Sequence, residues 1–363
     1  MKNILILTNF SDGLYSFRNE LVVDLLRTHK VILALPDDNS KQKFIDEGCE
    51  VVDYHLERRG MNPFKDIKVL FDYIRMIRIY RPEKVLTYTI KPNLYGGLAC
   101  RMTHTPCICN VTGLGTAIMN DSFLTRILLK MLKVSFAGAE RVFFQNEAGM
   151  RYMNEHGVAV NNCSLLPGSG VNVKIHTVQE YPSEKKGIRL LSVFRIMKDK
   201  GIGELLEAMD RVSAVRKDVT FVLAGDYEEE DRDRYEPVIN GLVQRGVLDY
   251  RGYVRDMDAL YGECHAVVHP TYHEGMSNVL LEASACGRSV IASDVPGCSE
   301  IVEDKVTGLL CEPKSADSLT ETIMEWLQLD ESAHEAMGKA AASFVAEHFD
   351  RQIIIDEYRQ LIK

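Results

Sequence analysis

The segment from His269 to Gly287 carries the residue types and the spacing best suited to chemistry. It reads HPTYHEGMSNVLLEASACG, with Glu274 in a polar loop and Glu282 eight residues later. We expect a helix over 277–286, and the first turn of a helix offers unpaired N–H groups and a positive dipole end to a phosphate. The two carboxylates could then bind hydroxyl pairs on either side of a diphosphate.

Two small residues between the carboxylates fit this interpretation. Gly275 would let a ligand approach the backbone closely, and Ser277 could cap the helix or bind an oxyanion. The alternative is that Glu274 is a charge in a loop and Glu282 a charge on a helix surface, and the spacing alone leaves it open.

Two cations form a second group, because Arg195 and Lys200 follow a strand expected over 188–194. Fixed cations at that position can offset the negative charge that builds on a departing diphosphate. An Arg and a Lys five residues apart in a loop are also commonly solvated, so this pair needs further support.

Short apolar strands alternate with amphipathic helices along the chain, which is typical of βαβ units in an α/β protein. The alternation runs from a strand over 3–8 to one over 141–145, breaks at Leu165–Gly170, and restarts at Ile188. We therefore predict two Rossmann-like domains with parallel sheets facing each other across a cleft, with ligands at the carboxyl ends of the strands. The predicted domains are 1–167 and 168–345, with a final helix over about 346–363 that packs back on the first.

Length and charge agree with two domains. The chain has 363 residues and a net charge of −9, which argues against a nucleic-acid-binding protein. Residues 1–167 hold 21 Lys and Arg against 17 Asp and Glu, and the rest hold 22 against 35. A mildly basic first half suits contact with phosphate or a membrane, although drift in composition would also explain the split.

The cysteines and the apolar runs indicate a compartment. The nine Cys residues contain no CxxC pair, which fits reduced thiols in a cytosol. The sequence lacks a signal peptide and has no run of eighteen apolar residues, so we expect a cytoplasmic protein.

The residues around Glu274 and Glu282 resemble the Glu-x7-Glu signature of family-4 glycosyltransferases, which are retaining nucleotide-sugar enzymes with the GT-B fold. The resemblance covers nearly the whole chain and is most specific over 270–310. The other segments that carry it are Phe194–Gly201, Leu223–Asp226, Val295–Gly297 and Thr307–Leu310.

A narrower resemblance is to bacterial enzymes that build capsule, O-antigen or lipid-linked oligosaccharide, and among them to those that add N-acetylgalactosamine to undecaprenyl-diphosphate-linked sugars. It implies transfer of a hexose or N-acetylhexosamine from a UDP-sugar to a polyprenyl-diphosphate-linked saccharide at the inner face of the cytoplasmic membrane. The donor that it favours is UDP-GalNAc. The segments that carry it are Tyr88–Asn93, Asn110–Gly115, Pro167–Val171, Glu274–Asn278 and Pro296–Glu300.

The resemblance also implies roles for the residues. Glu282 would bind the ribose hydroxyls and Glu274 the hydroxyls of the transferred sugar. Arg195 and Lys200 would stabilise the leaving diphosphate, which would itself accept the proton of the acceptor hydroxyl, so that neither a metal nor a cofactor is expected. The backbone N–H groups expected to hold the diphosphate are those of Met276, Ser277 and Asn278.

The first domain offers further candidates. Gly13 is expected in the loop from Thr8 to Tyr15, where it would let a phosphate or sugar approach. Arg18, on the first turn of the next helix, and Lys91 could bind the diphosphate of the acceptor, or could be surface cations.

One loop departs from the family pattern. Many family-4 enzymes place a His there, but 110–115 reads NVTGLG and holds none. Either Asn110 or Thr112 takes over that contact with the donor sugar, or the sugar is held differently.

The segment Phe123–Phe136 reads FLTRILLKMLKVSF, with cations three or four residues apart among apolar residues. Such a helix can lie on an anionic membrane. It can equally be a core helix with one solvated basic stripe.

A metal site is not expected. Asp256 and Asp258 form a DxD motif, but they lie where a helix begins, and Asp is favoured there as a cap. His265, His269 and His273 recur at a spacing of four without a Cys or His cluster to complete a site.

Two rival functions remain. One is a GT-B enzyme that makes or hydrolyses nucleotide sugars, such as a 2-epimerase, and the other is a non-catalytic sugar-nucleotide-binding assembly protein. An NAD-dependent dehydrogenase is less favoured, because no strand is followed by GxGxxG.

Overall fold

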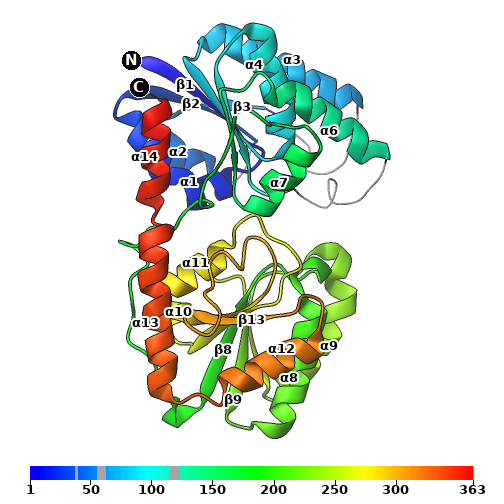
Figure 1. The fold of residues 1–363 in the computed structure, drawn as a ribbon, viewed down its shortest axis with the longest axis vertical. Helices are drawn as coiled ribbons and strands as arrows, with labels where there is room; N and C mark the ends of the chain where they lie inside the picture. The colour runs from blue at the N-terminus through cyan, green and yellow to red at the C-terminus, as the bar shows by residue number, and fades with distance from the viewer. Residues whose placement is uncertain (37–39, 55–62, 115–122, 363) are drawn as a thin grey trace. The chain divides into compact units, whose positions relative to one another are not determined.

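The computed structural model describes residues 1–36, 40–54, 63–114 and 123–362. They form two compact units, each built on its own parallel sheet (Figure 1). Unit 1 comprises Met1–Ser169 with Ile354–Lys363, and unit 2 comprises Gly170–Ile353. The first change of unit thus lies two residues beyond the expected one, within the Pro-Gly-Ser-Gly turn.

The sheet of unit 1 has seven strands in the order β3-β2-β1-β4-β5-β6-β7. Its central strands are largely apolar and buried because helices cover both faces of the sheet (Figure 1). The strands are β1 Lys2–Leu7, β2 His29–Leu35, β3 Glu50–Asp53, β4 Lys84–Tyr88, β5 Cys107–Val111, β6 Arg141–Phe144 and β7 Cys163–Leu165.

Most helices of unit 1 follow the expected pattern, but α7 and the short strand β7 were not predicted from the sequence. Both are short. Helix α7 buries only Met153, so its sequence shows no clear apolar periodicity. The helices are α1 Ser11–Leu26, α2 Lys41–Asp46, α3 Pro63–Tyr80, the π-helix η1 Pro92–Gly96, α4 Gly97–Thr103, α6 Phe123–Phe136 and α7 Glu147–Glu155.

The first helix begins earlier than expected, at Ser11 rather than near residue 16. Gly13 therefore lies in its first turn and not in a loop, which corrects the sequence prediction. A Cβ at Gly13 would lie 2.6 Å from the Phe10 ring, so the glycine makes room for that side chain. Asp12 in the same turn suits the positive end of the helix.

The last helix, α14 Arg351–Leu361, packs its C-terminal part against the sheet of unit 1. Ile354 and Ile355 join a buried cluster with β1. The Tyr358 hydroxyl donates to Oδ1 of Asn110 on β5, and Arg359 pairs with Asp24 on α1.

The sheet of unit 2 has six strands in the order β10-β9-β8-β11-β12-β13. Its strands are β8 Ile188–Val193, β9 Val219–Ala224, β10 Leu248–Gly252, β11 Ala266–His269, β12 Ser289–Ser293 and β13 Gly308–Cys311. The surrounding helices are η2 Glu184–Lys186, η3 Lys198–Lys200, α8 Ile202–Val215, η4 Glu229–Asp231, α9 Arg232–Gln244, α10 Met257–Gly262, α11 Asn278–Ala285, α12 Ala316–Trp326 and α13 Glu331–His348.

One expected helix of unit 2, over 298–302, is instead a series of turns after β12. The Cys298 N–H donates to the Val295 carbonyl and the Ile301 N–H to the Cys298 carbonyl. Gly297, directly before these turns, has a φ of +85° and packs against the Glu274 carbonyl, where a Cβ would lie 2.8 Å away. These turns stand at the carboxyl edge of the sheet, where α11 also begins.

Candidate active site

Close backbone packing fixes two loops at the carboxyl edge of the sheet in unit 2, one after β8 and one after β11. The Asp199 carbonyl accepts hydrogen bonds from Tyr272 N at 3.0 Å and from Thr271 Oγ1 at 3.4 Å. Gly201, at a φ of +71°, lies so near Pro270 that a Cβ would be 1.9 Å from its carbonyl oxygen. Lys200 therefore has a defined position relative to the loop that carries Glu274.

The turns after β12 close on the same loop from the other side. A Cβ on Gly297 would lie 2.8 Å from the carbonyl carbon and oxygen of Glu274. The Ser277 N–H donates to the Gly297 carbonyl at 2.8 Å. The Ser277 N–H, which the sequence predicts to bind a diphosphate, is thus engaged by the turn of 295–297 in this structure.

Glu274 forms the centre of a charged cluster. Its carboxylate makes a short ion pair with Lys200 and lies 3.1 Å from Nε2 of His269. Burial alone would raise the pKa of Glu274, but the hydrogen bond with His269 and the charge of Lys200 lower it to about 2. Glu274 is therefore ionised at neutral pH and can only accept hydrogen bonds.

Sequence reasoning rejected His269 as a metal ligand and gave it no other role. It is 2% exposed, and its Nε2 also lies 3.2 Å from Oγ of Ser277. One imidazole thus contacts both the Glu274 carboxylate and the cap of α11. The only sequence signal was its position as the last residue of a strand, five residues before Glu274.

Glu282 lies on the second turn of α11, partly buried rather than on an open surface. The Tyr261 hydroxyl of α10 donates to Oε2 of Glu282 at 3.1 Å, and burial raises the pKa of this carboxyl group. Both carboxylates of the signature are therefore built into the unit, which argues against simple surface charges.

The start of α11 agrees with the prediction. Ser277 is its N-cap, and its Oγ accepts from Leu280 N at 3.4 Å. Gly275 and Met276 immediately precede the cap and Asn278 is the first helical residue, so these residues surround the positive end of the dipole beside Glu274.

Arg195 does not join the cluster of Lys200 and Glu274. Its Nη1 donates to Glu228 at 2.7 Å, and 57% of its side chain is exposed. It lies on the same edge of the sheet, on a loop held by bonds from Ile196 N to the Asp226 carbonyl and from Glu228 N to the Ile196 carbonyl.

In unit 1, Asn110 is an interior residue, so its prediction as a residue that contacts a substrate sugar, whether of the donor or of the acceptor, is corrected. It is 2% exposed, its Nδ2 donates to the Thr87 carbonyl at 3.1 Å, and its Oδ1 accepts from Tyr358. It lies within β5 and not at the strand end, where α14 supplies its partner. Thr112, just after the strand end, remains at the carboxyl edge.

The two candidate acceptor cations of unit 1 are not open surface charges. Lys91 pairs with the buried Asp66 at 3.0 Å. Arg18 is the eighth residue of α1 and therefore does not lie in its first turn, where the sequence places it. Its side chain is buried, with 5% exposed, and its Nη2 donates to the Gly168 carbonyl at 3.2 Å. Its guanidinium lies 5.5 Å from the Tyr88 ring centroid, while its buried Nη1 has no hydrogen-bond partner among the described residues.

The DxD motif behaves in part as a cap. Asp256 is the N-cap of α10 and accepts from Ala259 N at 3.0 Å, as the sequence predicts. Asp258 instead contacts His176. His265 Nδ1 accepts from Arg189 N at 2.9 Å, a partner different from those of His269.

Family models match both halves of the chain. Residues 4–146 match the model described as glycosyl transferase 4-like, and residues 174–344 match glycosyl transferases group 1. The Campylobacter jejuni N,N'-diacetylbacillosaminyl-diphospho-undecaprenol alpha-1,3-N-acetylgalactosaminyltransferase is 28% identical, across 98% of this chain and 96% of its own. The capsular polysaccharide biosynthesis glycosyltransferase CapM of Staphylococcus aureus is 27% identical, across 84% and 82%.

Solved structures agree on the fold. Anabaena HepE, determined in complex with UDP and glucose, matches with a TM-score of 0.82 at 17% identity, covering all of this chain and 99% of its own. Sucrose-phosphate synthase from Thermosynechococcus elongatus matches with a TM-score of 0.82 at 18% identity, over 100% and 98%. With two parallel-sheet Rossmann-like units and a family match in each, the chain is a GT-B glycosyltransferase with a glycosyl transferase 4-like domain followed by a group 1 domain.

Proposed function

We propose that this glycosyltransferase moves a hexose or N-acetylhexosamine from a UDP-sugar to a lipid-diphosphate-linked saccharide, with retention at the anomeric carbon. The observation that carries the proposal is the preformed cluster of Lys200, Glu274 and His269 beside the N-terminus of α11. The name of the Campylobacter relative supports a lipid-linked acceptor and makes UDP-GalNAc the first donor to test.

The chemistry of each side chain indicates its role in sugar transfer. Glu274, held ionised with a pKa of about 2, is a poor general base but a strong hydrogen-bond acceptor for the hydroxyls of the transferred sugar. Glu282 would bind the ribose. Lys200, with Arg195 farther along the loop, would offset the charge on the leaving diphosphate in place of a divalent cation.

Unit 1 supplies the remaining candidate residues for substrate binding. Thr112 is our candidate for the contact with the donor sugar that other family members make with a His. Arg18 is our candidate for the acceptor diphosphate, since one buried guanidinium nitrogen lacks a partner among the described residues. Lys91 would contribute only if its ion pair with Asp66 opened.

Donor choice and reaction type can be tested together. The purified protein is incubated with a panel of UDP-, GDP- and ADP-sugars, with and without a polyprenyl-diphosphate-linked saccharide. We expect one UDP-sugar to be consumed only when acceptor is present, with an alpha linkage in the product. The same donor, at 100 times its dissociation constant, should stabilise the protein by about 2.7 kcal/mol. Conversion of free UDP-sugar without acceptor would instead indicate an epimerase or hydrolase, and binding without turnover an assembly protein.

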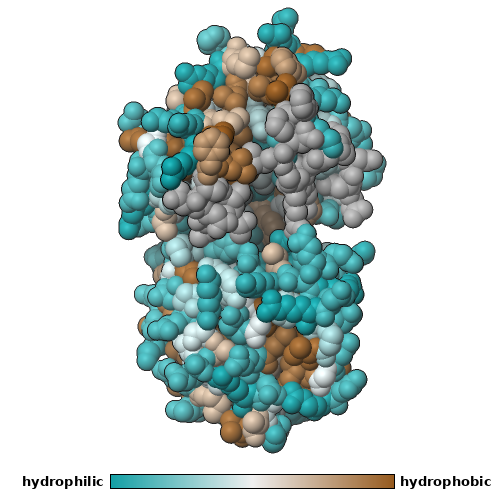
Figure 2. Space-filling view, turned by 90° about the vertical axis from the view of Figure 1, so that its right-hand side faces the viewer, coloured by the Kyte–Doolittle hydropathy of each residue, from teal (hydrophilic) through white to brown (hydrophobic). Residues whose placement is uncertain are grey.

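We further propose that unit 1 contacts an anionic membrane surface through α3, α4 and α6. These helices pack side by side, and large apolar side chains on them face outward. Phe123 is 81% exposed and Phe71 63%, and the others are Ile67, Ile79, Met102, Leu124, Ile127 and Val134. Figure 2 shows brown groups among teal ones on the face of unit 1 that is turned to the viewer.

Exposed cations accompany these apolar side chains on the same three helices. They are Lys65, Lys68, Arg75, Arg78, Arg101, Arg126, Lys130 and Lys133. The inner side of α6 is buried through Leu128, Leu129 and Leu132, so this helix is both a core element and a basic amphipathic surface. A core position for α6 is therefore compatible with the membrane contact that we propose for its exposed side. No helix among the described residues is long and apolar enough to cross a membrane.

Vesicle binding tests this surface. We expect Lys130→Gln combined with Lys133→Gln to weaken binding to vesicles containing anionic lipid by roughly 30-fold, at about 1 kcal/mol for each cation. The matched control is Lys185→Gln with Lys186→Gln, which removes the same charge from exposed positions of unit 2. Equal loss in both variants would mean that net charge, and not this surface, governs binding.

A further inference from the structure

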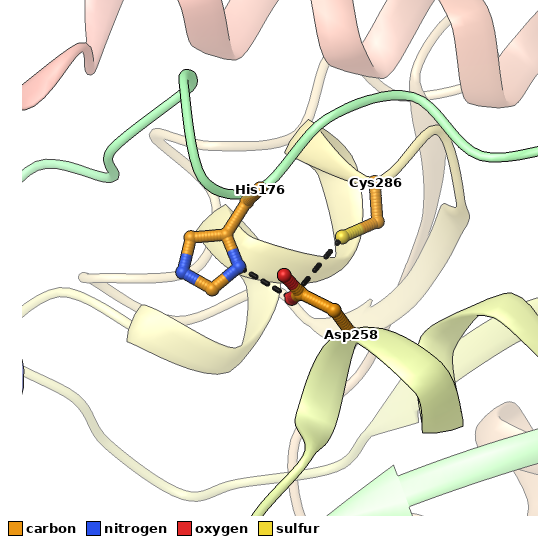
Figure 3. Close-up of side chains that lie close together, drawn as sticks. All are labelled: His176, Asp258 and Cys286. Atoms are coloured by element: carbon orange, nitrogen blue, oxygen red, sulfur yellow. Dashed lines mark hydrogen bonds and ion pairs between the residues drawn. The ribbon is translucent and has the colours of Figure 1, made fainter.

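Three potential metal ligands from distant parts of the sequence meet in unit 2. They are His176, Asp258 and Cys286, and one ligand atom of each lies within 4.8 Å of the others. Nδ1 of His176 is 2.6 Å from Oδ1 of Asp258, and Sγ of Cys286 is 3.7 Å from the same oxygen (Figure 3). The three side chains point toward one another from three separate segments.

Neighbouring hydrogen bonds hold these segments in place. His176 lies in a turn in which its N–H donates to the Asn172 carbonyl at 2.9 Å. The Gln179 side chain donates to the Asp258 carbonyl at 2.8 Å, while the Gln179 N–H donates to the Cys286 carbonyl at 3.2 Å. One residue thus fixes the main chain of two ligands, as a preorganised site requires.

The donor set selects the class of metal. An imidazole nitrogen, a carboxylate oxygen and a thiolate sulfur together favour Zn²⁺ over Mg²⁺ or Ca²⁺, which prefer oxygen alone. With Zn–N and Zn–O bonds near 2.1 Å and Zn–S near 2.3 Å, neighbouring ligand atoms of a tetrahedral site lie about 3.4–3.7 Å apart. The sulfur-to-oxygen distance already has this value, and the nitrogen-to-oxygen distance would need to open by about 1 Å.

We propose that His176, Asp258 and Cys286 bind a Zn²⁺ ion, with a fourth position left to water. The carboxylate of Asp258 is 30% exposed and the imidazole of His176 18%, so an ion can enter from solvent, while Cys286 is buried beneath them. Binding replaces the thiol proton, which is released to solvent. This proposal departs from the expectation, drawn from the sequence, that the chain holds no metal.

The site has a structural consequence for α11, which carries Glu282, and for α10 beside it. Asp258 lies in the first turn of α10, and Cys286 directly follows α11. Tyr261 of α10 donates to Glu282 of α11. A bound ion would therefore join these two helices to the segment around His176, which raises the melting temperature of unit 2 when the ion is added.

Cobalt(II) is a direct probe, because a tetrahedral cobalt site with a thiolate ligand has intense visible bands and a near-ultraviolet charge-transfer band. Metal-stripped, reduced full-length protein is titrated with Co²⁺ and then with Zn²⁺. We expect one equivalent of Co²⁺ to produce both bands and one equivalent of Zn²⁺ to abolish them. The Cys286→Ser variant should lose the charge-transfer band, and His176→Gln should weaken binding at least tenfold.

The matched control is Cys163→Ser, which removes a partly exposed thiol from unit 1 and should leave the spectrum unchanged. Absence of the thiolate band in the wild-type protein, or its persistence in Cys286→Ser, would overturn the proposal. A melting curve for each variant shows that the fold is retained, and the partly exposed His176 provides a second test if Cys286→Ser unfolds. The absorption bands measure metal binding and do not depend on sugar transfer. Success or failure of this experiment therefore does not bear on the proposed glycosyltransferase activity.

Discussion

We expect Lys200→Ala to lower kcat for sugar transfer by roughly 10²- to 10³-fold, the scale on which one preorganised electrostatic contact contributes to a transition state. The lysine is 21% exposed and paired with Glu274, so its ammonium has a fixed position at the edge of the sheet. That position depends on backbone contacts from Asp199 and Gly201 to the loop after β11, and these contacts do not involve the lysine side chain.

The effect should fall on catalysis rather than on folding. Without Lys200, the Glu274 carboxylate keeps its contact with Nε2 of His269, so the loop retains a side-chain contact with the end of β11. Glu274→Gln should also lower kcat strongly, and the double variant should lose less than the product of the two single losses, because the pair acts as a unit.

Lys198→Ala is the control for Lys200→Ala, because Lys198 lies in the same short helix η3 but is exposed. It should turn over at close to the wild-type rate. Kinetics with the donor identified above, together with a melting curve for each variant, separate the outcomes. A folded Lys200→Ala protein within threefold of wild-type kcat would remove the lysine from the mechanism.

The second large effect concerns stability. We expect Arg288→Met to lower the free energy of unfolding of unit 2 by about 3–5 kcal/mol, because hydrogen bonds to a charged donor contribute about 1.5–3 kcal/mol each and buried acceptors left unpaired are costly. Arg288 is fully buried, and burial lowers its pKa. Among the described residues, its hydrogen-bond partners are main-chain carbonyls.

The carbonyls bound by Arg288 belong to three segments. Nε donates to the Tyr261 carbonyl at 2.9 Å and Nη2 to the Glu180 carbonyl at 2.8 Å. Longer bonds reach the carbonyls of Gln179, Gly262 and Gly287. Tyr261 and Gly262 end α10, where the dipole favours a cation. Lysine has three donors and lacks the planar fork, so Arg288→Lys should restore only part of the stability.

The chain provides its own reporter for this measurement. Trp326 is the single tryptophan of the sequence, is fully buried in unit 2, and stacks on His334 at 3.6 Å between ring centroids. Urea unfolding followed by its fluorescence therefore reports unit 2. Arg251→Met, which removes an exposed Arg paired with Asp249, should cost about 1 kcal/mol or less. Equal midpoints for the two variants would contradict the assigned role of Arg288.

The fold followed from local patterns because each strand of a parallel sheet is a short apolar run and each covering helix is amphipathic. The errors have different causes. The early start of α1 is a local error, because Phe10 and Gly13, which lie in contact, are only three residues apart. The turns that replace the expected helix after β12 pack through Gly297 against the Glu274 carbonyl, a tertiary contact that neighbouring residues do not reveal.

The site was predictable where its members share one segment. Glu274, Ser277 and Glu282 lie within nine residues, so a helix start between two acids indicated their arrangement. The partners that set their properties come from elsewhere: Lys200 from another loop, and Tyr261 from α10.

The misassigned residues show the same limit. Asn110 looked available at the end of a strand, yet its partner Tyr358 lies 248 residues away. The second Asp of the DxD motif was set aside as part of a helix start, and only the fold reveals that it meets His176 and Cys286. His176 is 82 residues from Asp258 and Cys286 is 28 residues from it, so no short sequence motif contains the three residues.

The placement of α14 in unit 1 has a consequence for how the chain is made. Ile354, Ile355, Tyr358 and Ile362 complete a cluster that includes Ile4 and Ile6, so the first strand of unit 1 packs against residues that are synthesised only after unit 2. Domains usually fold as they emerge, N-terminal first. Here unit 1 cannot complete this cluster until residues 354–362 have been synthesised, and unit 2 is synthesised in the interval. A chain truncated near Asp350 would leave the nascent first half with an exposed apolar face and would be recognised by chaperones or proteases.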